Sequence, residues 1–95
     1  MKPSLYYIWY DLGYIYYLQG ADYYERSNEE EDEDFRQQLL DLGEERYKLA
    51  IPVLEKSLSL NVDINPAVHF ETLDLLQRIY YKEQMMDDYN RIKAL

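Results

Sequence analysis

The feature that most restricts the fold of this chain is an aromatic helix near its amino terminus. Eight of the twelve tyrosines and the one tryptophan fall between Tyr6 and Tyr24. Apolar residues recur there at helical spacing and surround most of the circumference, which leaves hardly any polar face. Such a helix needs cover on several sides, so either other helices wrap it or part of it is a surface for a partner.

Length and charge limit the class of protein. Ninety-five residues, 47% of them hydrophobic, suffice for a single domain with one core. The chain has no cysteine, which excludes disulfides and thiolate metal sites. The net charge of −9 disfavours nucleic acid and anionic membrane surfaces as partners, because the ten Lys and Arg residues are dispersed along the sequence.

The aromatic segment from Leu5 to Tyr24 is long enough to raise the possibility of a membrane span. Asp11 and Asp22 argue against insertion, since each would cost roughly 2.5–3.5 kcal/mol in hydrocarbon, and tyrosine prefers the membrane interface. A signal peptide is also disfavoured, because no small-residue cleavage site follows an aliphatic run. We expect a cytoplasmic location if the chain is complete, and the cell envelope if it is a fragment of an exported parent.

Apolar periodicity predicts four helices and no strands, over about residues 5–24, 35–60, 66–82 and 86–94. Ser4 is the expected N-cap of the first helix. Pro52 lies inside the second helix, where it removes a backbone donor, so we expect a bend there or a helix that restarts near Ile51. Asn65 and Pro66 have the residue types expected for the N-cap and first position of the third helix.

Between the first two helices the sequence turns strongly acidic. The run NEEEDED, residues 28–34, has no apolar residue and many like charges, so it indicates a solvated loop or a frayed helix end. A calcium-binding loop needs alternating ligands and a turn glycine, which this run lacks. We expect residues 29–34 to be exposed and mobile and to bind no metal.

The aromatic helix carries the spacing W-x2-L-G-x2-Y, formed by Trp9, Leu12, Gly13 and Tyr16. This spacing resembles the first-helix signature of the tetratricopeptide repeat. The large residues share one helix face, and Gly13 beside them lets a partner helix approach closely. The resemblance continues in the second predicted helix with Tyr47, Ala50, Leu54 and Ser57. It implies that Trp9, Leu12 and Tyr16 belong to the core and that Trp9 is buried between the two helices.

A more degenerate second repeat resembles the same pattern near the carboxy terminus. Its Trp, Leu and Tyr places hold Leu73, Leu76 and Tyr80. Gln77 replaces the glycine, Tyr89 stands where a small residue is usual, and Val62 stands where a proline commonly closes the first repeat. These departures suit a terminal capping unit.

The resemblance therefore implies an all-α fold of antiparallel hairpins, similar to the carboxy-terminal end of certain bacterial tetratricopeptide proteins and part of a right-handed superhelical array. One domain is expected over residues 1–95, with a lengthened first repeat over about 4–61, an acidic insertion near 25–34 and a capping second repeat over about 65–95. The alternative is that the aromatic stripe marks the core of a different helical bundle.

The tetratricopeptide family binds peptides and proteins along the concave surface made by the first helix of each repeat. The resemblance implies a non-enzymatic interaction or scaffold module whose concave face carries Tyr7, Tyr10, Tyr14, Tyr17, Glu71, Asp74, Arg78 and Tyr81. Tyrosine suits such a surface because it offers apolar area, a hydroxyl and few rotors to freeze. Arg78 is the one basic residue in this set, which disfavours an acidic peptide tail and favours an apolar or basic segment.

Two alternatives remain for the tyrosines. They pack on a neighbouring repeat absent from this chain, or on a second copy, and the chain is then the self-associating, capping end of a longer repeat protein with no ligand of its own. Two repeats are fewer than the three usually needed for a stable array. We therefore expect the isolated chain to associate, most simply as a two-fold dimer through the first helix, with Tyr7, Tyr10, Tyr14 and Tyr17 near the contact.

No combination of residues predicts catalysis. The chain has one histidine, His69, no thiol and no glycine-rich phosphate loop. A carboxylate metal site in a helical bundle would use a Glu-x-x-His motif, which the sequence also lacks. We expect no enzymatic activity, no cofactor and no metal.

Overall fold

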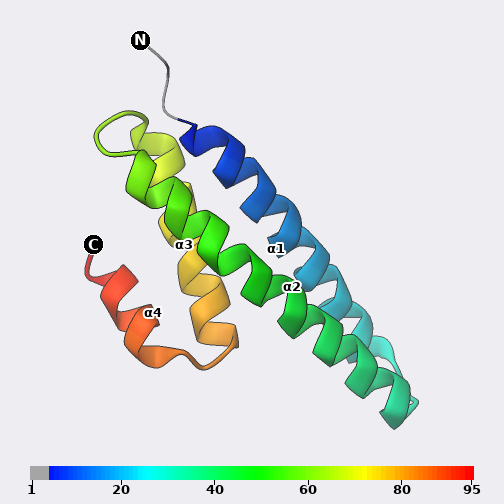
Figure 1. Ribbon diagram of the computed structural model, residues 1–95. Helices are drawn as coiled ribbons and strands as arrows, with labels where there is room; N and C mark the ends of the chain where they lie inside the picture. Colours follow the sequence, from blue (N-terminus) through cyan, green and yellow to red (C-terminus); the bar gives the residue numbers. More distant parts are fainter. Residues whose placement is uncertain (1–4) are drawn as a thin grey trace.

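The computed structural model describes residues 5–95, which form four helices and no strand. The helices are α1 (Tyr6–Glu29), α2 (Glu33–Leu60), α3 (Pro66–Lys82) and α4 (Met86–Lys93). α1 and α2 form a long antiparallel hairpin, and the shorter α3 and α4 pack along one side of it (Figure 1). The predicted all-α class with four helices is confirmed, and the molecule is elongated, with extents of 53 × 26 × 17 Å.

Small residues at intervals of seven let α1 and α2 approach each other closely. Two buried series share this spacing: Gly13, Gly20 and Ser27 in α1, and Gly43, Ala50 and Ser57 in α2. An interval of seven returns each residue to nearly the same side of its helix. A Cβ atom at Gly13 would lie 2.5 Å from the Leu54 side chain, and one at Gly20 would overlap the ring of Tyr47. The close contact therefore requires glycine at both positions.

The core lies where α3 packs against the hairpin. Its buried apolar residues come from three helices: Tyr47, Ala50, Leu54, Leu73, Leu75, Leu76, Ile79, Tyr80 and Ile92. One carboxylate joins the same three helices, because Glu55 Oε2 of α2 accepts hydrogen bonds of 2.5 Å from the Tyr80 hydroxyl of α3 and from Arg91 of α4. This contact fixes the short α4 against α2 and α3.

The start of α3 agrees with the sequence prediction. Asn65 is the N-cap and its side-chain oxygen accepts the N–H of Val68 at 3.2 Å, while Pro66 opens the helix. The buried Asn61 holds the preceding loop, since its side chain bonds both the N–H and the C=O of Asn65. Asn65 also donates to the hydroxyl of Tyr6 at 3.2 Å, which ties the loop to α1.

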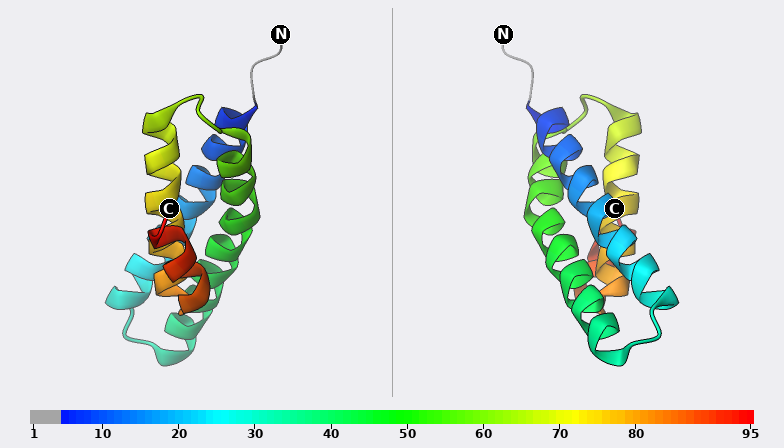
Figure 2. Two further views of the ribbon diagram at one scale, coloured as in Figure 1. Left: turned by 90° about the vertical axis from the view of Figure 1, so that its left-hand side faces the viewer. Right: turned by 90° about the vertical axis from the view of Figure 1, so that its right-hand side faces the viewer.

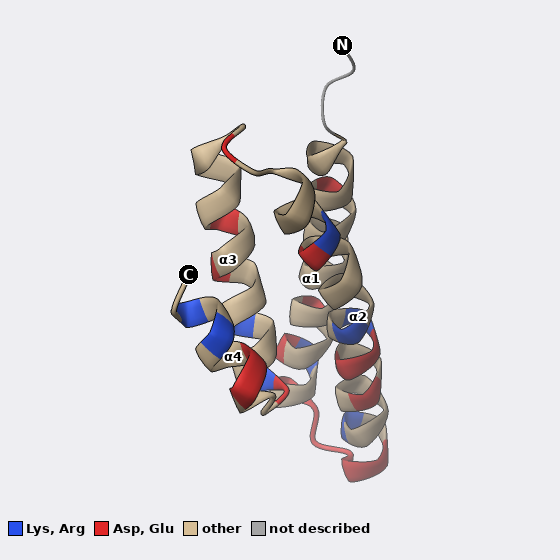
Figure 3. Ribbon diagram, turned by 60° about the vertical axis from the view of Figure 1, so that its left-hand side comes forward, with Lys and Arg blue, Asp and Glu red and all other residues tan. Residues whose placement is uncertain are grey.

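The acidic run is more helical than predicted. α1 continues to Glu29, and the connection to α2 spans only residues 30–32 (Figure 3). Asp32 is the N-cap of α2, accepting the N–H of Phe35 at 3.0 Å, and carboxylates in the first turn of a helix are favoured by its dipole. The residues of this turn are exposed except the half-buried Glu30, whose carbonyl accepts a bond from Arg36. Ser4, the expected N-cap of the first helix, lies outside the described residues.

Pro52 does not interrupt α2, so the restart considered near Ile51 does not occur. Buried residues on both sides of the proline, Ala50 and Leu54, hold the two turns against α1. Pro52 itself is exposed. It has no N–H for the carbonyl of Lys48 four residues earlier, and that carbonyl is therefore open to water.

The large residues of the repeat motif in α1 are less buried than predicted. Leu12 is 37% exposed, which contradicts its assignment to the core, and Trp9 and Tyr16 are only half-buried. The reason is that α3 packs along one side of α1 (Figure 2). Leu12 lies two residues from Tyr10 and therefore on the opposite side of that helix, which no described helix covers. The residues at the corresponding places of the predicted second repeat are all buried: Leu73, Leu76 and Tyr80.

Candidate functional site

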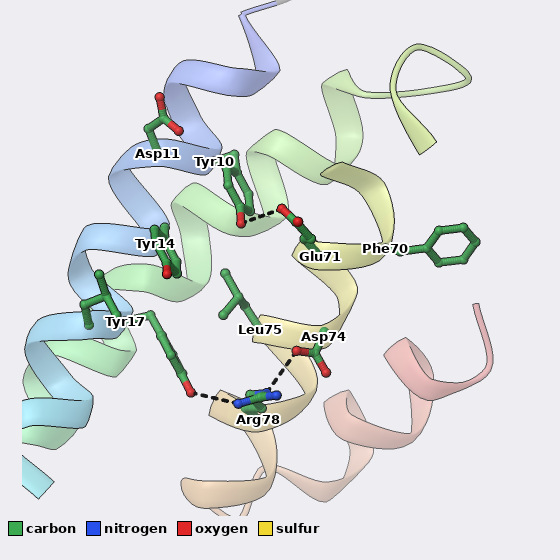
Figure 4. A pocket seen from close by; sticks show the side chains of 10 residues that line it. Tyr10, Asp11, Tyr14, Tyr17, Phe70, Glu71, Asp74, Leu75 and Arg78 are labelled. Atoms are coloured by element: carbon green, nitrogen blue, oxygen red, sulfur yellow. Dashed lines mark hydrogen bonds and ion pairs between the residues drawn. The ribbon is translucent and has the colours of Figure 1, made fainter. Parts of the chain in front are cut away.

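A groove of about 720 Å³ runs between α1 and α3. It is lined by Tyr10, Asp11, Tyr14, Tyr17, Leu18, Phe70, Glu71, Asp74, Leu75 and Arg78. The side chains come from two helices that lie side by side although about sixty residues separate them in sequence (Figure 4). Six of the eight residues that the sequence predicted for a concave surface lie in this lining: Tyr10, Tyr14, Tyr17, Glu71, Asp74 and Arg78.

Helical spacing explains why these side chains meet. On α1 the tyrosines recur at intervals of four and three, and on α3 the charged residues recur at three and four, so each set occupies one side of its helix. The buried Leu75 forms the apolar floor between them. Phe70 lies at the rim and points away from the groove, with 68% of its surface exposed (Figure 4).

Polar contacts cross the groove at two levels. The hydroxyl of Tyr10 donates to Glu71 Oε2 at 2.9 Å. Further along, Arg78 donates to the hydroxyl oxygen of Tyr17 at 3.5 Å and pairs with Asp74 at 3.0 Å (Figure 4). These contacts join α1 to α3, so the groove has a defined width rather than two independent walls.

Two polar groups of the groove, Tyr10 and Arg78, each keep one protonation state at neutral pH. Burial, followed by the hydrogen bond to Glu71, raises the pKa of Tyr10 well above its ordinary value. The contact with Tyr17, followed by the attraction of Asp74, raises the pKa of Arg78. Tyr10 therefore stays a neutral donor and Arg78 stays a cation.

The tyrosines form two stacked pairs. The rings of Tyr10 and Tyr14 are 6.0 Å apart and nearly parallel, and Tyr17 stacks on Tyr47 of α2 at 5.4 Å. Tyr17 is thereby tied to the core, whereas Tyr14 remains 42% exposed. Tyr14 is therefore the tyrosine of the groove that is most available to a ligand.

Tyr7 and Tyr81, the other two predicted residues, lie outside the groove. Tyr7 is exposed and its ring meets Tyr6 edge to face at 5.9 Å. Tyr81 packs on Tyr89 and lines a neighbouring hollow of about 250 Å³. That hollow shares Asp74 and Arg78 with the groove, so Tyr81 extends the surface at one end while Tyr7 does not belong to it.

The groove carries more negative than positive charge. Its lining includes the carboxylates of Asp11, Glu71 and Asp74 and the guanidinium of Arg78. The sequence prediction missed Asp11, as well as Leu18, Phe70 and Leu75. All four are three or four residues from predicted members on the same helix, and that spacing was a usable signal.

Other features of the described residues offer less chemistry. Among residues 5–95 no group of three or more His, Asp or Glu side chains could hold a metal ion. His69 lines a separate hollow of about 230 Å³ beside the loop between α2 and α3. None of the described helices is both long and apolar enough for a membrane span.

Comparison with known proteins gives no relative for this chain: no family model, curated sequence or solved structure matches it.

Proposed function

We propose that this chain is a non-enzymatic protein-interaction module, similar to a tetratricopeptide repeat pair, that binds a segment of a partner protein in the groove between α1 and α3. The observation that carries the proposal is the meeting of Tyr10, Tyr14 and Tyr17 with three charged residues of α3 in one groove. Both helices are the first helices of their repeats in the sequence interpretation. The groove therefore has the place that a concave ligand surface has in that family.

The chemistry of the lining favours a segment with basic and apolar side chains. Three carboxylates against one guanidinium attract Lys or Arg, and the exposed ring of Tyr14 offers a face for a cation. The buried Leu75 and the stacked Tyr10 provide an apolar surface beside these charges. An acidic segment would meet repulsion from the same carboxylates.

The test is fluorescence anisotropy with a short labelled peptide of Lys, Leu and Ser residues and a matched peptide in which Glu replaces Lys. We expect the basic peptide to bind and the acidic one not to bind. Tyr14→Ala and Asp74→Asn each weaken binding by about tenfold, because they remove the cation's aromatic and carboxylate contacts.

The control is Glu31→Gln, which removes one negative charge in the turn between α1 and α2, far from the groove (Figure 3). Glu31→Gln should change the dissociation constant of the peptide by less than about twofold, because this exposed charge is further from the groove than the length over which salt screens charges. Equal losses for Asp74→Asn and Glu31→Gln would mean that the peptide responds only to net charge, and the groove would not be the site.

A further inference from the structure

A second apolar surface lies on the side of α1 away from the groove. Four aliphatic residues at intervals of three, four and three form one stripe of α1: Leu5, Ile8, Leu12 and Ile15. Each is between 37% and 50% exposed. At 100° per residue this stripe is on the opposite side of α1 from Tyr10 and Tyr17, which pack toward α3.

α2 continues this surface. Leu49 is exposed, and Val53, one turn further on, is half-buried with its Cγ2 beside Gly13 of α1. We call the stripe of α1 together with Leu49 and Val53 the back face. Among the described elements, α4 makes no contact with α1, and α3 contacts α1 on the groove side, so the back face is uncovered.

A comparison of Leu12 with Leu76, which the repeat resemblance aligns, indicates that the back face is incomplete. Leu76 of α3 has the same place in its repeat as Leu12 of α1, and Leu76 is fully buried. Leu76 owes its burial to the core formed with α2, whereas Leu12 has no such neighbour. Exposed aliphatic residues in a continuous stripe mark an interaction surface on a small domain.

Charges of opposite sign border the two sides of the back face. Asp11, which also belongs to the groove lining, lies at the rim of the groove, and its carboxylate points away from α3 (Figure 4). Lys56 lies three residues after Val53 and is exposed on α2. Gly13 lies against Leu54 and Gly20 against Tyr47, so Asp11 and Lys56 stand at the same level of the antiparallel hairpin. Within residues 5–95 neither side chain forms an ion pair.

The α2 side carries a second cation without a partner. Arg46 forms no ion pair within the described residues, and its Nε atom is buried without an acceptor. Asp22 stands at about the same level on α1 and is already paired with Arg26 at 3.1 Å. At the levels of Asp11 and Asp22, α1 thus carries a carboxylate and α2 carries a cation, with the exposed Glu45 beside Arg46 on α2.

We propose that the back face is the interface of a two-fold dimer of this chain, with the axis parallel to the hairpin. This axis lays α1 of one copy over α2 of the other and sets Asp11 opposite Lys56 of the second copy. An axis across the helices would instead set Asp11 over Asp11, which like charges disfavour. The occupant of the back face is therefore a second copy, whose borders complement those of the first. The groove stays open on the outer sides of the dimer, and Asp11 is the one residue that the groove lining shares with the proposed interface.

The first test is the mass in solution, measured by sedimentation equilibrium. The wild type is expected at twice the chain mass of 11.6 kDa, and Leu12→Glu at the monomer mass with an unchanged far-UV circular dichroism spectrum. Tyr14→Glu is the matched control, because it places the same charge on the groove side of α1, and it remains a dimer. A wild type that is monomeric at millimolar concentration, or a dimeric Leu12→Glu, would overturn the proposal.

The second test is a charge exchange that also fixes the orientation. Asp11→Lys and Lys56→Glu each weaken dimerisation by about tenfold, because two attractions per dimer become repulsions. The double variant recovers the wild-type affinity. If the losses of dimer affinity in the two single variants added up in the double variant, the proposed axis would be excluded. Lys56 does not line the groove, so the result for Lys56→Glu tests the dimer whether or not the peptide-binding proposal holds.

Discussion

Tyr10 and Glu71 are joined by a hydrogen bond of 2.9 Å from the tyrosine hydroxyl to Oε2, across sixty-one residues of sequence. The bond brings a residue of the first helix beside a residue of the third, and it places the exposed ring of Tyr14 next to the carboxylates of α3. The proposed interaction function depends on this contact between α1 and α3.

The close approach of α1 and α2 depends on Gly20. Gly20→Val is expected to lower the free energy of unfolding by about 2 kcal/mol, since the added carbons overlap the buried ring of Tyr47 and the helices must separate. Urea denaturation measures the change, with the exposed Gln19→Val as a control for helix propensity. A Gly20→Val protein as stable as the control would contradict the tight interface.

Leu12 and Leu76, which the repeat resemblance aligns with each other, should differ in their contribution to stability. Leu76→Ala is expected to lower the free energy of unfolding by about 2–5 kcal/mol, because the side chain is fully buried. Leu12→Ala should cost about 1 kcal/mol or less when measured at a concentration low enough to keep the chain monomeric. Equal losses in urea denaturation would show that another element covers Leu12.

High pH should weaken the packing of α3 on α2. Burial, followed by the hydrogen bond to Glu55, raises the pKa of Tyr80 above its ordinary value of 10.0. Because the unfolded chain releases this proton first, the stability linked to Tyr80 is fully present below about pH 10 and is lost as the pH rises further. Urea denaturation between neutral and alkaline pH should give a falling free energy of unfolding, and Tyr80→Phe should reduce the slope. An unchanged slope would contradict the assignment.

Two neighbouring acidic residues should behave differently in the turn before α2. Asp32→Ala is expected to lower the free energy of unfolding by about 1 kcal/mol, because Asp32 caps the helix through the N–H of Phe35. Glu31→Ala removes the same charge without a cap and should change stability by less than about 0.5 kcal/mol. Calcium should not raise the melting temperature of either protein, and a calcium-dependent rise would revive the metal-site alternative.

The sequence predicts the number of helices and the start of α3 because those features depend on local signals. Asn65 and Pro66 are such a signal, and the structure uses both as predicted. The like charges of the acidic run suggested a loop, so the length of α1 was underestimated. α2 begins within the same run because Asp32 caps it and its dipole favours Glu33 and Asp34 in the first turn. Helix propensity alone does not predict whether like-charge repulsion or helix capping decides the local structure.

The candidate site was more predictable than the packing around it. Spacing alone groups the tyrosines of the groove, and the repeat resemblance adds the charged residues of α3. Burial of Leu12 was predicted wrongly because a motif states which face is apolar but not whether another helix is present to cover it. The matched series of small residues ending at Ser27 and Ser57 was visible as an interval of seven, yet its role follows only from the antiparallel pairing of the two helices.

The most direct test of the groove as a ligand site is a two-dimensional NMR titration of the full chain with the Lys, Leu and Ser peptide. We expect the amide shifts to change mainly in the groove segments of α1 and α3, with the largest changes near Tyr14 and Asp74. The acidic turn at residues 30–32 should change little. Shifts centred on that turn, or spread evenly over the acidic residues, would contradict the proposed function.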